Sequence, residues 1–221
     1  MGTINVSSVV SKAQIILQDT TGIRWPELEL LGWLNDGQRD IAVHKPNAFV
    51  KNVSHSLAVG TKQTLPGDGV LLIDIVRNLP NGRAVRIVMR EILDAQIPNW
   101  HSAPASGEIK HYTYSHLDPK TFYVYPPSNG GNNVELVYGA APTEAALGGT
   151  ITLDDIYATA LLDYVLYRGY SKDTEYAADQ NRSANHYAAY IATVSGKASV
   201  EGVVNPNMTA PANPNITPNS R

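Results

Sequence analysis

The sequence predicts an α+β protein, in which a bundle of about four helices carries inserted antiparallel β-hairpins and is followed by an extended C-terminal tail. Apolar residues recur every three to four positions near both ends of the chain and alternate with a period of two in the middle. The last residues are rich in asparagine and proline. The length of 221 residues allows one domain with a sizeable core. We expect a single domain over residues 1–197, a β insertion over residues 50–139 within it, and the tail over residues 198–221.

Two helices are predicted before the β insertion. The first spans residues 4–19 and ends at a Thr-Thr-Gly sequence. The second spans residues 26–45, begins at Pro26 with two glutamates in its first turn, and ends before Pro46. Their apolar faces comprise Val6, Val10, Ala13 and Leu17 in the first helix, and Leu30, Trp33, Leu34 and Ile41 in the second.

The first hairpin is predicted to join residues 70–79 to residues 83–90 around a Pro-Asn-Gly sequence. A two-residue turn would place Arg77 directly opposite Arg86, which is unfavourable, so we expect a three-residue loop. This register creates a charged cluster in which one carboxylate lies diagonal to two guanidinium groups. The cluster comprises Asp74, Arg86 and Arg90.

The second hairpin is predicted to join residues 109–116 to residues 121–125, and residues 134–138 can add a third strand. With a four-residue turn, tyrosines of the two strands lie opposite each other and form one face of the ribbon. These four residues are Tyr112, Tyr114, Tyr123 and Tyr125. The tyrosines either pack in the sheet because they fit it or form a protein interface, and the pattern favours both equally. Sugar binding and base stacking are weaker alternatives, because base stacking normally needs a basic groove.

Two further helices are predicted over residues 152–170 and 173–195. The first of them begins at a capping box formed by Thr152 and Asp155. The second is expected to stop at Gly196. It carries a seam for close packing that comprises Ala177, Ala184, Ala188 and Ile191.

Composition and motifs argue against an enzyme. The chain has no cysteine, which excludes disulfides and thiolate chemistry, and its net charge of −3 disfavours a nucleic-acid binder. The phosphate-binding glycine loop, the His-Glu-x-x-His motif and the nucleophile elbow are all missing. The six histidines are scattered, and the acid pair at 154 and 155 is explained by helix capping. We therefore expect neither catalysis, nor a metal, nor a cofactor, nor a signal peptide or membrane segment.

The order of the elements resembles the head-to-tail adaptor proteins of tailed bacteriophages, also called connector or head-completion proteins, particularly those of short-tailed phages. The resemblance spans roughly residues 4–190. It rests on WPELELLGWLNDGQRDIAVHKPNA in the second helix, LPGDGVLLIDIVRNLPNGRAVRIVMREILD and HYTYSHLDPKTFYVYPP in the hairpins, and TLDDIYATALLDYVLYRGYSKDTEYAADQNRSANHYAAY in the last two helices.

The resemblance implies a structural virion protein that is assembled in the host cytoplasm. Such a protein forms a ring of about twelve subunits under the portal, binds tail or nozzle proteins below and extends the DNA channel for genome retention and ejection. The DNA would pass without sequence-specific binding, and no cofactor or membrane is involved. Another tail component, such as a tail terminator, is an alternative, as is a carbohydrate-binding module that uses the tyrosine face.

Two groups of candidate site residues follow from this resemblance. A subunit interface would use the tyrosine face and the charged cluster, namely Tyr112, Tyr114, Tyr123, Tyr125, Asp74, Arg86 and Arg90. The C-terminal segment would contact the portal through Val203, Asn205, Pro206, Met208, Pro211, Pro214, Ile216 and Arg221.

Overall fold

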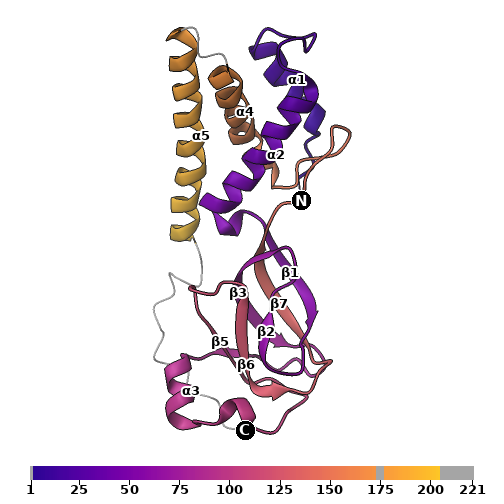
Figure 1. Cartoon of the computed structure of the whole chain (residues 1–221), viewed down its shortest axis with the longest axis vertical. Coiled ribbons are helices and arrows are strands. Elements are labelled where there is room, and N and C mark those ends of the chain that lie inside the picture. The colour runs from indigo at the N-terminus through magenta and orange to yellow at the C-terminus, as the bar shows by residue number, and fades with distance from the viewer. Residues whose placement is uncertain (1, 173–176, 205–221) are drawn as a thin grey trace. The chain divides into compact units, whose positions relative to one another are not determined.

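A computed structural model describes residues 2–172 and 177–204, and in the last helix it describes the side chains of residues 178–196. Five α-helices and two sheets lie within these residues, and they confirm the α+β class. The chain divides into two compact units, one formed by residues 1–45 and 144–221 and the other by residues 46–143. The first unit is helical, and the second contains the β insertion (Figure 1).

The helical unit is a bundle around α4. Its elements are α1 (Val6–Ile16), α2 (Glu27–His44), the 3-10 helix η3 (Asp155–Tyr157), α4 (Ala158–Lys172) and α5 (Ala177–Val204). α1, α2 and α5 each pack against α4, and Figure 1 shows α4 between α5 and α1. The apolar faces predicted for the first two helices are confirmed, with Trp33 half-buried. The seven buried residues are Val6, Val10, Ala13, Leu17, Leu30, Leu34 and Ile41.

Two glycines allow the helices to approach α4 closely. A Cβ atom on Gly37 of α2 would lie 3.0 Å from Cδ1 of Tyr164, and one on Gly169 of α4 would lie 3.1 Å from Cδ2 of Leu17. Larger residues at these positions would push the helices apart, since packed cores leave little free space.

One carboxylate holds the connection between α1 and α2. Asp19 accepts hydrogen bonds from the backbone amides of Ile23, Arg24 and Trp25 at 3.1, 2.7 and 2.8 Å. These bonds, led by that of Trp25, lower the pKa of Asp19 below its ordinary value. The indole Nε1 of Trp25 donates to the carbonyl of Gly169 at 3.2 Å, which attaches the connection to α4.

The predicted capping box at Thr152 and Asp155 is wrong. Asp154 is the N-cap of η3, and its carboxylate accepts a hydrogen bond from the amide of Ile156 at 3.1 Å. Asp155 accepts three hydrogen bonds from the N-terminal segment instead, from the Thr3 amide at 2.6 Å, the Thr3 hydroxyl at 2.5 Å and the Ile4 amide at 3.0 Å. α4 therefore begins after η3 and later than predicted, because these acids stabilise a different turn.

α5 is longer than predicted and packs through a different face. It continues through Gly196 to Val204, so residues 198–204 are helical rather than extended, and residues 205–221 lie outside the described residues. Tyr190 and Val194 are buried against the bundle, whereas Ala184 and Ala188 of the predicted seam are exposed. The larger side chains set the rotation of the helix because they bury more apolar area than alanine does.

The β unit contains two small sheets. The first has the strand order β1 (Val50–Ser56), β7 (Asn133–Ala140), β3 (Gly69–Asn78). The second has the order β2 (Gly60–Thr64), β6 (Thr121–Ser128), β5 (His111–Tyr114), β4 (Arg86–Ile87). Three short helices complete the unit, namely η1 (Pro46–Ala48), α3 (Arg90–Gln96) and η2 (Trp100–Ser102).

The first predicted hairpin forms only next to its turn, where Arg77 pairs antiparallel with Ala84 and the amide of Asn78 donates to the carbonyl of Arg83 at 2.8 Å. The rest of the prediction is wrong, because β3 pairs with β7 and β4 pairs in parallel with β5. Three register shifts along β3 set three of its residues against every two of β7. The bulged residues Val70, Ile73 and Val76 are left outside the ladder and are exposed, while Leu72 and Ile75 are buried. The burial of β3 thus repeats every three residues, which a period of two cannot predict.

The second predicted hairpin exists, but its register is shifted by one residue. Tyr112 pairs with Val124 and Tyr114 with Phe122, and Tyr112 is buried in the core while Tyr114 is half-buried. Tyr123 and Tyr125 lie on the opposite face, because one step along a strand reverses the direction of the side chain. The four-tyrosine face is therefore not formed. The third strand predicted at residues 134–138 belongs to the other sheet, as part of β7.

Candidate interaction surfaces

The charged cluster predicted around Asp74 is rearranged. The hydroxyl of Tyr112 donates a hydrogen bond to Oδ1 of Asp74 at 2.8 Å. Burial raises the pKa of Tyr112, and the neighbouring carboxylate raises it further. Arg90 pairs with Asp94 at 3.3 Å, and no ion pair within the described residues joins Asp74 to Arg86 or Arg90. The predicted pairs are missing because β4, which carries Arg86, pairs with β5 instead of β3.

Tyr112 and Tyr114 protect the outer edge of β3. Burial raises the pKa values of Tyr112 and Tyr114. The backbone amide of Ile75 partly offsets this rise at Tyr112, and that of Leu72 does so at Tyr114. Tyr114 also donates to the carbonyl of Pro119 at 3.2 Å. The end of this edge is paired, since Arg77 forms a bridge with Ala84 and the amide of Val85 donates to the carbonyl of Val76 at 3.2 Å. Pairing of this edge with other chains is thereby limited.

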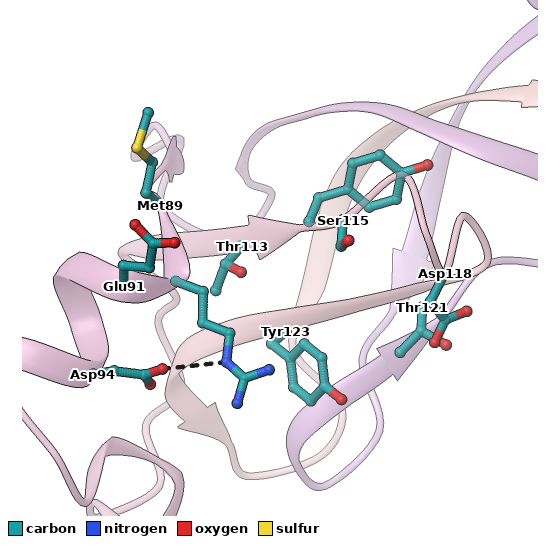
Figure 2. A pocket seen from close by; sticks show the side chains of 10 residues that line it. Met89, Glu91, Asp94, Thr113, Ser115, Asp118, Thr121 and Tyr123 are labelled. Carbon is teal, nitrogen blue, oxygen red and sulfur yellow. Dashed lines mark ion pairs between the residues drawn. The ribbon is translucent and has the colours of Figure 1, made fainter.

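A groove with mostly polar or charged lining residues lies beside these strands on the outer face of the second sheet (Figure 2). Its volume is about 550 Å³, and its walls come from the start of α3, the β5–β6 turn and both strands of that hairpin. Figure 2 shows Glu91 and Asp94 on one side, Asp118 on the other and Tyr123 along the floor. With Arg90 engaged by Asp94, the groove offers carboxylates and hydroxyls for hydrogen bonding.

An aromatic cluster fixes the ring of Tyr123. Trp100 is fully buried and stacks on His101 with 3.6 Å between ring centroids, and both rings meet Tyr123 edge-on. The indole of Trp100 donates to Asp94 at 2.8 Å, and the hydroxyl of Thr61 lies 2.8 Å from His101 Nδ1. These contacts explain why Tyr123 is half-buried rather than presented as a flat stacking platform.

The tyrosines of the last two helices form a second cluster in the helical unit. Tyr164 and Tyr190 are buried with 5.2 Å between their ring centroids, and Tyr190 donates to Asp40 at 2.6 Å. Tyr187 lies at the edge of this cluster, 4.9 Å from the ring of Tyr167, and is 42% exposed. Most of these rings pack inside the helical unit, whereas part of Tyr187 is exposed at the surface.

Sequence periodicity missed most of the exposed apolar surface. Leu117 is 97% exposed at the tip of the β5–β6 turn, and Met89 is 72% exposed beside the groove. In the helical unit, four exposed residues lie within one short segment, namely Ile15, Ile16, Ile23 and Leu28. These residues are apolar but do not belong to the predicted apolar faces. That mismatch is the signal that could have identified them as exposed surface residues.

The remaining candidate residues are those of the predicted portal contact. Val203 lies in the last turn of α5, and the other seven portal-contact candidates lie outside the described residues. Within residues 2–172 and 177–204, no three His, Asp or Glu side chains gather as a metal site requires. The helices in these ranges also include none that is long and apolar enough to span a membrane.

One protein-family model matches the chain across both units. Residues 4–213, which include nearly all of both units, match a family of bacteriophage adaptors, so the chain is a structural protein of the virion. It belongs to the SU10 adaptor protein family. The predicted resemblance to phage head-to-tail adaptors is thereby confirmed, and an adaptor of this kind contacts portal and tail components. No curated protein matches the chain.

Proposed function

We propose that the protein forms a ring of about twelve copies that joins the portal to the tail and continues the DNA channel between them. The observation that carries this proposal is the family match over residues 4–213, because it includes the helices, the β unit and part of the C-terminal segment. The ring would assemble in the host cytoplasm, retain the packaged genome and release it at ejection.

Charge supports the passage of DNA without tight binding. Each phosphate that a protein neutralises adds affinity, and the net charge of −3 on each chain keeps that affinity low. The residues that contact the portal are proposed to lie in the C-terminal segment, from Val203 to Arg221. Between subunits, the ribbon residues that retain exposed area remain candidates, namely Tyr114, Tyr123, Tyr125, Asp74, Arg86 and Arg90.

A carbohydrate-binding module is disfavoured, because the four-tyrosine face that supported it is not formed. A tail terminator remains an alternative within the virion.

Electron microscopy of phage particles made without this protein tests the proposal. We expect DNA-filled heads that lack tails and lose their genome on storage, and gold-labelled antibody should bind complete particles at the neck. A tail terminator predicts heads joined to tails of abnormal length instead. Complete infectious particles without the protein would contradict both functions.

A further inference from the structure

Two outer helix faces of the helical unit lack the charges that water-facing helices normally carry. α1 contains no acidic residue and one basic residue, Lys12. In α5, residues 183–196 contain no Asp, Glu, Lys or Arg at all. This absence is notable because the unit as a whole holds nine basic and thirteen acidic residues, a net charge of −4.

Both faces expose large side chains. On α1, Ile15 is 65% exposed, while the opposite side of the helix is buried in the bundle. Ile16 is 43% exposed but lines a groove with Asp179 and Arg182, so it lies outside the charge-free face. On α5, Tyr187 is 42% exposed and its ring is held against Tyr167. Interface cores are depleted of charge and enriched in tyrosine, and a ring already fixed by its neighbours loses little entropy on binding.

We propose that the α5 face around Tyr187 of one copy packs against the α1 face around Ile15 of the next copy. This inference rests on the proposed ring and names one contact between neighbouring copies in it, beside the candidates in the β unit. Two helical units of like net charge repel each other, so acid-free faces are where they can approach. Lys12 on α1 adds an attraction to the negative unit of the neighbour.

The positions of the two helices suit a ring. α1 and α5 both pack on α4, and Figure 1 shows α4 between them, so each copy presents two different faces. A contact between two different faces is heterologous, and such contacts close into rings when the rotation allows it. A symmetric dimer would need one face that is complementary to itself.

The size of the contact predicts when it forms. α1 has 11 residues and is therefore about 16 Å long, so one helix crossing covers a few hundred Å². A stable pair of free proteins buries roughly 800 Å² on each partner. We expect the contact to be weak between free copies and to persist in the closed ring on a portal, where every copy uses both faces.

Intermolecular cross-linking tests this contact. Because the natural chain has no cysteine, only the introduced cysteines can react. Ser11→Cys on α1 and Ala188→Cys on α5 change two exposed positions. The two single variants are mixed, assembled on portal rings and treated with a short bismaleimide, so that any cross-link joins two chains. We expect a dimer band from the mixture, and little from either variant alone. The matched control mixes Ala188→Cys with Val43→Cys, an exposed position on α2, and should stay monomeric.

A charge variant gives an independent readout. Ala188→Glu keeps a good helix former at an exposed site and should lower ring assembly at least tenfold without changing the thermal midpoint. Thr159→Glu places the same charge on an exposed position of α4 and should leave assembly unchanged. Rings that form normally but give no Ser11–Ala188 cross-link would overturn this contact and leave the proposed function standing. Failure to form rings on any portal would overturn both.

Discussion

The hydroxyl of Tyr190 in α5 donates a 2.6 Å hydrogen bond to the carboxylate of Asp40 in α2. Tyr190 is fully buried, and this burial, with Asp40 next to it, raises the pKa of its phenol. The bond joins two helices that otherwise make few contacts, and it adds to the apolar burial that keeps Tyr190 inside while Tyr187 stays at the surface.

Removing this hydroxyl should destabilise the helical unit. Tyr190→Phe leaves the ring in place but deprives Asp40 of a donor, and we expect a loss of about 1–3 kcal/mol in unfolding free energy. Chemical denaturation followed by circular dichroism measures it. Tyr187→Phe is the matched control, because Tyr187 is 42% exposed and loss of its hydroxyl should cost less than about 0.5 kcal/mol. Equal effects of the two variants would show that the Tyr190–Asp40 bond contributes nothing.

Asp155 predicts an acid sensitivity. Hydrogen bonds from the Thr3 hydroxyl and then from the amides of Thr3 and Ile4 lower its pKa below the ordinary value of 3.8. A lowered pKa means that the stabilisation is present above the ordinary value and is lost as the pH falls through the folded-state value. The thermal midpoint should therefore fall more between about pH 5 and pH 2 in the natural protein than in Asp155→Asn.

The control for this pH profile is Asp154→Asn, the same chemical change at the adjacent residue. It keeps a side-chain oxygen that can accept from the amide of Ile156, and it leaves the N-terminal segment attached. Its profile should keep the slope of the natural protein. Identical slopes in the natural protein and Asp155→Asn would refute the role given to this carboxylate.

The bulges of β3 predict opposite outcomes for two neighbouring isoleucines. Ile75 lies in the ladder and is fully buried, so Ile75→Ala should cost about 2–5 kcal/mol of unfolding free energy. Ile73 is a bulged residue and 38% exposed, and Ile73→Ala should cost clearly less, about 1 kcal/mol. Urea unfolding of both variants decides the matter, and similar costs would favour a regular strand over the bulged one.

Much of the fold follows from local patterns, and its failures have physical causes. The periodicity of α1 and α2 predicts their buried faces because each helix buries one stripe. The same logic fails in β3, where the bulges replace a period of two by a period of three. It also fails at Asp155, which bonds to Thr3, 152 residues away along the chain. No local pattern contains that contact.

The candidate surfaces were less predictable than the fold. The observed β5–β6 register differs from the predicted one by one residue, so Tyr112 lies in the core and the predicted tyrosine face does not form. The family resemblance predicted the adaptor class correctly, because it depends on the order of elements along the whole chain. A surface residue such as Ile15 can be recognised as a candidate contact only when the structure shows which side of its helix is buried in the bundle.

The C-terminal segment gives a prediction that separates folding from assembly. Truncation after Val204 leaves α5 intact and removes residues 205–221, so the thermal midpoint should change by less than about 2 °C. Binding to a portal ring should nevertheless fall at least tenfold in a sedimentation assay. Undiminished portal binding by the truncated chain would place the portal contact elsewhere.

Native mass spectrometry of the protein mixed with purified portal rings tests the central claim most directly. The account predicts one discrete complex, in which about twelve copies of the 23.9 kDa chain are added to each portal. A protein that stays monomeric at every ratio to the portal, or binds in variable numbers without a closed stoichiometry, would contradict it.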